Sequence, residues 1–192
     1  MRTHVFLPLL GLLAVTAPPL TAAVPFAGEV TIEGAGGANA VLTGDFDGDG
    51  APDIAAIGTG RVFYVLNSGD ASAWTAQDLT TNPGRARRFA IADLDGDLDN
   101  DIIYTDWLDS RVYWFSNQLN VSGDFSNRRT VGVVFRADGV DAADLDGDGD
   151  IDVVTSSRHQ GIYYWLENDN GSGTSWTRHE VRHVQHLRSG EA

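Results

Sequence analysis

The segment Asp144-Leu-Asp-Gly-Asp-Gly-Asp-Ile-Asp152 places a carboxylate at every second position across nine residues. Two earlier segments align with it, Asp45-Phe-Asp-Gly-Asp-Gly-Ala-Pro-Asp53 and Asp93-Leu-Asp-Gly-Asp-Leu-Asp-Asn-Asp101. Their first residues are 48 and 51 positions apart. Self-similarity at a period of this length predicts a protein built from structural repeats.

Two further sets of segments keep the same period. An aromatic and β-branched set consists of Val62-Phe63-Tyr64-Val65, Val112-Tyr113-Trp114-Phe115 and Ile162-Tyr163-Tyr164-Trp165, with a spacing of 50 residues. A set that begins with an aromatic residue and ends with an aliphatic one covers residues 74–79, 125–131 and 176–181. Residues 26–32 resemble this last element and predict an outer strand that precedes the three units.

Each unit is interpreted as four short strands. In the middle unit we expect them at residues 88–92, 102–105, 111–116 and 125–134. The second of these is a short apolar run, as expected of a strand that is covered on both faces. The third is rich in the aromatic and β-branched residues that favour strands. Four strands in every ~50 residues predict an all-β fold, a β-propeller with three four-stranded blades and a leading strand.

Composition narrows the classes of function. The chain has a formal net charge of −14 and no cysteine, and fourteen of its 27 acidic residues fall in the three aspartate segments. Such acidity argues against binding to nucleic acid or to anionic membranes, because phosphates would be repelled. The absence of cysteine excludes a disulfide scaffold, a thiolate metal site and a cysteine nucleophile.

The first 23 residues have the features of a secretory signal peptide. A positive start at Arg2 is followed by an apolar run over residues 5–15, and Thr21-Ala22-Ala23 offers small residues for cleavage before Val24. The alternative is a membrane anchor, but the run is shorter than the ~20 residues that a spanning helix needs. We therefore expect a secreted or cell-surface protein, periplasmic or extracellular in a bacterium, with no membrane span after signal removal.

The aspartate segments predict calcium sites. Two carboxylates at 4 Å repel each other by about 4 kcal/mol at an effective dielectric constant of 20, so an ordered loop of this kind requires a cation. Calcium accepts six to eight oxygen ligands in irregular geometry, whereas magnesium prefers an octahedron and zinc prefers His or Cys. Carboxylates at positions 1, 3 and 5 would turn toward one point, and glycine at positions 4 and 6 permits the tight path. An EF-hand is excluded, because position 12 is Ala56, Tyr104 or Thr155. The alternative is three solvated acidic turns without metal.

The pattern resembles FG-GAP/VCBS repeats, the calcium-loop blades of integrin-α-type propellers and of many secreted bacterial proteins. The resemblance implies that each loop joins the first two strands of a blade and that about one calcium ion per loop staples this hairpin. By resemblance, the side-chain ligands are Asp45, Asp47, Asp49, Asp53, Asp93, Asp95, Asp97, Asp101, Asp144, Asp146, Asp148 and Asp152. The residues that would lend backbone carbonyls are Ala51, Asp99 and Asp150. The second loop departs from the pattern, because Leu98 replaces glycine at position 6.

The unit spacing also carries an expectation about domain organisation. We expect blades at approximately residues 40–79, 86–131 and 137–181 of a mature chain that begins at residue 24. Propellers have at least four blades, so these units predict a ring that is incomplete. We expect the repeats to continue beyond residue 192, as in an N-terminal portion of a longer protein. The alternative is that several copies assemble to close the ring.

Other side chains are weaker candidates for chemistry. Beyond the predicted signal segment, histidine occurs at positions 159, 179, 183 and 186, but alternation along a strand would point the last two to opposite faces. The aromatic stripes are interpreted as blade-to-blade core in preference to a sugar platform. Two basic spots, at Arg85, Arg87 and Arg88 and at Arg128 and Arg129, are interpreted as surface charges on strands.

The sequence therefore favours a secreted calcium-binding propeller module for adhesion or for ligand or carbohydrate binding, in which calcium is structural. The expected partners are calcium and a glycan or a cell-surface or extracellular protein. No catalytic residue is assigned, and an enzyme is the less favoured class. Two alternatives stay open: the propeller part of a secreted carbohydrate-active enzyme of the lyase or dehydratase type, and a structural spacer in a surface protein.

Overall fold

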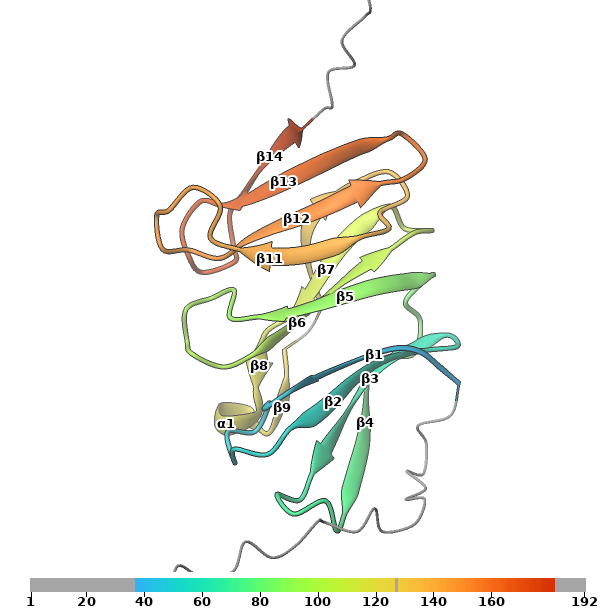
Figure 1. Cartoon of the computed structure of the whole chain (residues 1–192), viewed down its shortest axis with the longest axis vertical. Coiled ribbons are helices and arrows are strands. Elements are labelled where there is room, and N and C mark those ends of the chain that lie inside the picture. Colours follow the sequence, from blue (N-terminus) through green and yellow to red (C-terminus); the bar gives the residue numbers. More distant parts are fainter. Residues whose placement is uncertain (1–36, 127, 182–192) are drawn as a thin grey trace, which may run out of the picture. The chain divides into compact units, whose positions relative to one another are not determined.

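The computed structural model describes residues 37–126 and 128–181. This part of the chain contains three four-stranded antiparallel sheets, one two-stranded sheet and one short helix (Figure 1). The expected all-β fold of four-stranded propeller blades is confirmed, and within the described residues the three sheets do not close into a ring. The predicted signal segment, the leading strand at residues 26–32, His183 and His186 lie outside the described residues.

The three blades follow one another along the chain. Blade 1 contains β1 (Ala38–Gly44), β2 (Asp53–Gly58), β3 (Arg61–Asn67) and β4 (Trp74–Thr80). Blade 2 contains β5 (Ala86–Ala92), β6 (Asp101–Asp106), β7 (Arg111–Phe115) and β10 (Arg129–Val133). Blade 3 contains β11 (Val140–Ala143), β12 (Asp152–Ser157), β13 (Ile162–Asn168) and β14 (Trp176–Val181). In each blade the strand order follows the chain, so every neighbouring pair is antiparallel.

The first strand of each blade lies nearest to the first strand of the next blade. Strand β5 contacts both β1 and β11 (Figure 1). The second strand is buried, and in blade 2 all six residues of β6 are inaccessible to solvent, as its apolar run predicted. Each aspartate loop therefore starts where the first strand ends and stops where the second strand enters the core.

The cores of the molecule lie between blades. One cluster joins Phe46 of blade 1 to Phe115 and Phe125 of the blade 2 unit, and a second joins Leu94 of blade 2 to Val153 and Leu166 of blade 3. Phe46 and Leu94 occupy the second position of their aspartate loops and are each 1% exposed. The aromatic stripe of blade 2 belongs to these cores, with Trp114 fully buried. The expectation that the stripes are mainly blade-to-blade core holds for this blade.

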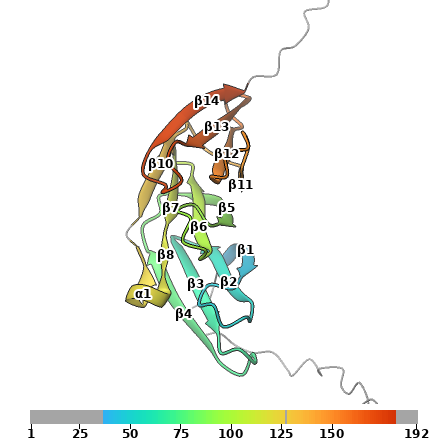
Figure 2. The ribbon, with the colours of Figure 1, turned by 90° about the vertical axis from the view of Figure 1, so that its left-hand side faces the viewer.

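The fourth strand of the middle unit differs from the expectation. Instead of one strand over residues 125–134, the chain forms β8 (Asn117–Gln118), α1 (Leu119–Ser122) and β9 (Asp124–Phe125) before β10. Phe125 pairs with Asn117 and packs against Phe46 and Tyr64 of blade 1, with ring centroids 5.9 and 4.9 Å apart. The packing of Phe125 on blade 1 thus outweighs the pairing that a continuous outer strand would give. The insertion formed by β8, α1 and β9 lies beside blade 1 (Figure 2).

Two hairpin glycines allow a matched test of the interface between blades 2 and 3. Gly173 and Gly161 both have a left-handed φ, +63° and +66°. A Cβ on Gly173 would lie 2.6 Å from the Trp114 ring, whereas a Cβ on Gly161 meets nothing within 4 Å. Gly161→Ala is expected to lower the free energy of unfolding by about 1 kcal/mol, the cost of left-handed alanine. Gly173→Ala adds overpacking of about 1–3 kcal/mol. Urea denaturation of both variants checks the difference, and equal losses would contradict the packing of Trp114.

In the part of the chain that the structure describes, no helix has the length and hydropathy to cross a membrane.

Candidate metal centres

The three aspartate loops have the same local architecture. The carboxylate at position 1 accepts hydrogen bonds from the backbone N–H groups of positions 4 and 6. In the first loop Asp45 accepts from Gly48 at 2.8 Å and from Gly50 at 3.0 Å. The corresponding bonds in the other loops join Asp93 to Gly96 and Leu98, and Asp144 to Gly147 and Gly149. These backbone hydrogen bonds fold each loop around the carboxylate of its first aspartate, and they require no ion.

Left-handed backbone at positions 4 and 6 permits this path. The glycines at both positions have φ between +73° and +98°. Leu98, which replaces glycine in the second loop, adopts the same conformation with φ +73°, and its side chain is 91% exposed. The replacement of glycine by Leu98 at position 6 therefore leaves the backbone path of the loop unchanged. Its cost is about 1–2 kcal/mol of backbone strain.

Three carboxylates converge in each loop. One oxygen from each of Asp45, Asp47 and Asp53 lies within 4.8 Å of the others, and Asp93, Asp95 and Asp101 converge in the same way. In the third loop the converging set is Asp144, Asp146 and Asp148. The groupings thus use positions 1, 3 and 9 in two loops and positions 1, 3 and 5 in the third. The carboxylates of Asp49, Asp97 and Asp152 are not in these sets, nor are Ala51, Asp99 and Asp150, whose expected contribution is a backbone carbonyl.

The aspartate at position 9 has a structural role of its own. Asp101 is fully buried, and its two oxygens accept hydrogen bonds from Leu94 N at 2.9 Å and Asn117 N at 2.7 Å. Asp53 and Asp152 make the equivalent pair of bonds in their blades. These carboxylates tie the loop to the end of the third strand in blades 1 and 3, and to the start of β8 in blade 2. Burial raises the pKa of Asp101 to about 8, against the opposite effect of its two backbone hydrogen bonds.

The second loop offers the clearest fit for a cation. Asp95 Oδ2 accepts a hydrogen bond from the Ser116 hydroxyl at 2.9 Å, whereas Asp95 Oδ1 is buried without a partner. Burial raises the pKa of Asp95, and the negative charges of Asp97 and Asp93 raise it further. A buried carboxylate oxygen with no donor costs free energy unless a cation compensates it. Clustered carboxylate oxygens are the donors that suit calcium, whose shell backbone carbonyls can complete.

Sequence reasoning missed an asparagine that each blade repeats. Asn67 and Asn168 end the third strands β3 and β13, whereas Asn117 begins β8, two residues after the end of β7. The three asparagines are 50 and 51 residues apart. The Nδ2 atom of Asn117 donates to Phe46 O in the loop of blade 1 at 2.7 Å, and that of Asn168 donates to Leu94 O of blade 2 at 2.9 Å. These two inter-blade asparagines join the aspartate loops of blades 1 and 2 to the blade that follows. Their regular spacing was the available signal.

The weaker candidates take other roles. His179 Nε2 lies 2.5 Å from Glu167 Oε2, and the imidazole stacks on Trp165 on the outer strands of blade 3. His159 lies on the β12–β13 hairpin, where its ring meets Phe135 edge-on. Arg128 donates to Tyr104 Oη at 2.8 Å, and Arg129 lies over the Trp114 ring. Among the described residues, histidine is absent from the converging carboxylate sets.

The repeated architecture agrees with comparison to known proteins. A model of the FG-GAP-like repeat matches residues 45–104 and again residues 93–155, so the two matches together span more than half of the chain. The chain belongs to the FG-GAP-like repeat family. Both matches begin at the first aspartate of a loop, Asp45 and Asp93, which are the residues that organise the FG-GAP loops described above.

The FG-GAP blades also resemble a solved structure. That structure is a lectin of Agrocybe aegerita, described as recognising non-reducing terminal N-acetylglucosamine specifically. It is 22% identical, with a TM-score of 0.54, over 73% of this chain and 37% of the lectin chain. This similarity concerns the fold, and the chain spans little more than a third of the lectin's length. No curated protein matches the sequence significantly.

Proposed function

We propose that this FG-GAP-like protein is an exported repeat module that binds a saccharide, with calcium ions as structural staples of its blades. The observation that carries the calcium part of the proposal is the convergence of three carboxylates in each of three loops. The acidic excess of the chain resides in these loops, which is expected if bound cations neutralise it.

A structural role for calcium is supported by the position of the loops. Each loop connects the first and second strands of a blade, and its ninth residue is hydrogen bonded to the end of the third strand or, in blade 2, to β8, which follows that strand. An ion held by Asp45, Asp47 and Asp53 would thus fix the relative position of three strands, and one held by Asp93, Asp95 and Asp101 would do the same in blade 2. In the third loop the converging set does not include Asp152, so an ion there would join the loop itself. Calcium would supply positive charge there and no bond-making chemistry.

Saccharide binding is supported by the similarity to the Agrocybe aegerita lectin, which has been described as recognising N-acetylglucosamine. The separation of the described histidines is also relevant, since His159 lies on a hairpin and His179 on an outer strand with Glu167 as its partner. A cluster of histidines would favour an enzyme, whereas separated histidines favour a binding module. Export is supported by the apolar segment at residues 5–15. Adhesion to a cell-surface or extracellular partner is proposed as the use of such saccharide binding.

A glycan array tests the proposal with the intact chain. In buffer with millimolar calcium we expect retention of at least one class of neutral or acidic oligosaccharide, and we expect EGTA to abolish it because the blades lose their staples. Magnesium added in excess over EGTA serves as the control and is not expected to restore retention. Absence of retention on every glycan, by protein whose circular dichroism shows folded strands, would refute saccharide binding.

A further inference from the structure

The end of the blades opposite the aspartate loops is rich in arginine. In an antiparallel blade the loop between strands one and two and the hairpin between strands two and three lie at opposite ends. Arg158 lies on such a hairpin, Arg85 and Arg88 lie at the start of blade 2, and Arg136 precedes blade 3. The chain as a whole is strongly acidic, so this local accumulation of positive charge separates the two ends electrostatically.

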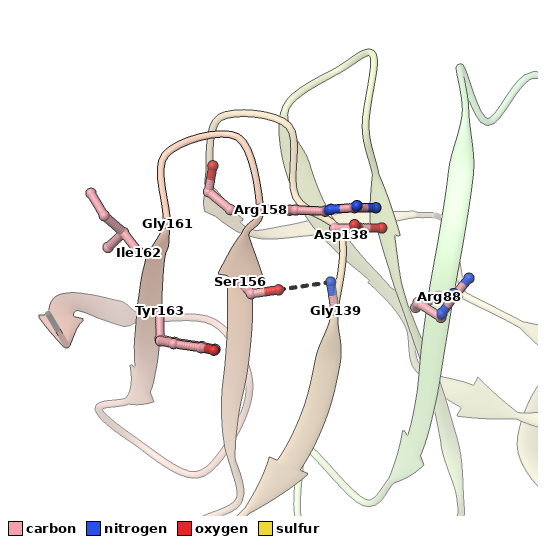
Figure 3. A pocket seen from close by; sticks show the side chains of 9 residues that line it. Arg88, Asp138, Gly139, Ser156, Arg158, Gly161, Ile162 and Tyr163 are labelled. Carbon is pink, nitrogen blue, oxygen red and sulfur yellow. Dashed lines mark hydrogen bonds between the residues drawn. The ribbon is translucent and has the colours of Figure 1, made fainter. Parts of the chain in front are cut away.

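Two adjoining hollows of about 400 Å³ each open among these arginines. Arg88, Ser156 and Tyr163 line the first, and Arg85, Trp107 and His159 line the second. Asp138 and Arg158 border both. We call the two hollows together the arginine pocket; Figure 3 shows the first, with Arg158 extended from its hairpin toward Asp138 and Arg88 on the neighbouring strand.

The positive charge of the arginine pocket is incompletely neutralised. Arg87 pairs with Asp138, with Nε 3.0 Å from Oδ1. Among the described residues, Arg85, Arg88 and Arg158 form no salt bridge. Arg88 donates one hydrogen bond to a backbone carbonyl, and Arg85 lies over the Trp107 ring at 5.3 Å. Each of these guanidinium groups therefore keeps N–H donors for a ligand, and a guanidinium matches the planar fork of a carboxylate.

Hydrogen bonds fix the walls of the arginine pocket. Ser156 Oγ accepts from Gly139 N at 3.0 Å, so its own proton is free to be donated. The backbone of Asp138 is fixed on both sides, because its N–H donates to Ser156 O at 2.9 Å and its C=O accepts from Thr105 Oγ1 at 3.0 Å. Tyr163 presents an aromatic ring that is 56% exposed. Fixed hydroxyl, carboxylate and aromatic groups beside unpaired guanidinium groups are complementary to a sugar that carries an acid.

We propose that the arginine pocket binds an acidic saccharide of the uronate class. The sugar carboxylate lies between the guanidinium groups of Arg88 and Arg158, and sugar hydroxyls bond to Ser156 and Asp138. This inference rests on the proposed saccharide binding and names its ligand class. It also places the ligand at the end of the blades away from the calcium loops, so the ions do not touch the sugar.

Isothermal titration of the intact chain in calcium tests the assignment with three tetrasaccharides. The probes are a hyaluronan tetrasaccharide, which carries carboxylates, N-acetylchitotetraose, which is neutral, and a keratan sulfate tetrasaccharide, which carries sulfate alone. We expect the hyaluronan fragment to bind at least tenfold more tightly than the other two. Arg158→Gln should weaken its binding at least tenfold, and so should Arg88→Gln. The matched control Arg129→Gln removes an exposed arginine of blade 2 outside the pocket and should leave the affinity unchanged.

The outcomes separate this inference from the proposed function. Equal binding of the neutral fragment, or unchanged affinity in both pocket variants, would overturn the acidic ligand while leaving saccharide binding intact. Preference for the keratan sulfate fragment would overturn the carboxylate assignment. If no tetrasaccharide binds and the glycan array is also negative, both the uronate assignment and the proposed saccharide binding are refuted. Circular dichroism of each glutamine variant confirms that the fold is retained.

Discussion

Removal of calcium from the intact chain is expected to lower its thermal unfolding midpoint by on the order of 5–10 °C for each loop that loses its ion. A ligand that binds only the folded state adds about 2.7 kcal/mol at a hundredfold excess over its dissociation constant. Without the ion, three carboxylates within 4.8 Å of one another repel, and Asp95 Oδ1 stays buried without a partner. Circular dichroism melts across a calcium titration, with EGTA and magnesium controls, measure the effect.

A single substitution assigns the effect to the loops. Asp146→Ala removes one of the three converging carboxylates of the third loop, so we expect calcium stoichiometry to fall from about three ions to about two. The control is Asp141→Ala on β11, which lies outside the loop and whose carboxylate accepts a local bond from Ala142 N. Equal stoichiometry in the wild type and in Asp146→Ala would count against the ligand assignment, and loss of calcium in Asp141→Ala would indicate a general charge effect.

The second large effect is expected at an inter-blade asparagine. Asn117→Ala should lower the free energy of unfolding by about 3 kcal/mol, because three hydrogen bonds of a fully buried side chain are lost. Its Nδ2 donates to Phe46 O and Asn100 O at 2.7 and 3.1 Å, and its Oδ1 accepts from Leu119 N at 3.1 Å. Phe46 O would then be left in the core without this donor. Urea denaturation in saturating calcium gives the free energy.

Asn67→Ala provides the matched control for this prediction. Asn67 has the same place in blade 1, where its Nδ2 donates to Pro52 O and its Oδ1 accepts from Ala71 N. Among the described residues it has no partner in another blade, so we expect a loss of about half that of Asn117→Ala. Amide exchange distinguishes the two mechanisms, since only Asn117→Ala should speed exchange in the loop of blade 1. Equal losses, with no change in that loop, would refute the inter-blade role.

The fold could be predicted because its signals repeat. The aspartate loops, the aromatic third strand and the buried second strand recur every ~50 residues, so each unit supports the interpretation of the others. The insertion around α1 occurs in one unit alone, and its cause is the packing of Phe125 against Phe46 and Tyr64, which are distant in sequence. A contact of that kind has no local pattern.

Part of the candidate site was visible in the sequence, and part was not. The aspartates at positions 1, 3 and 5 indicated a cation, but the double backbone bonding of Asp101 depends on where the chain turns into β8 after the third strand. The arginines at positions 85, 87 and 88 were interpreted as ordinary surface charges on strands. The sequence did not reveal their neighbours Trp107 and Arg158, because three separate segments bring these residues together.

The inter-blade asparagines have a consequence for symmetry. In both described interfaces the donor belongs to the later blade and the acceptor is the loop carbonyl of the earlier one, Phe46 O or Leu94 O. The two sides of such an interface are chemically different, so the contact is heterologous. Two molecules joined by it are related by a rotation that continues in one sense, toward a closed ring or an open helix. A two-fold symmetric pair requires a self-complementary surface and cannot be built from this contact.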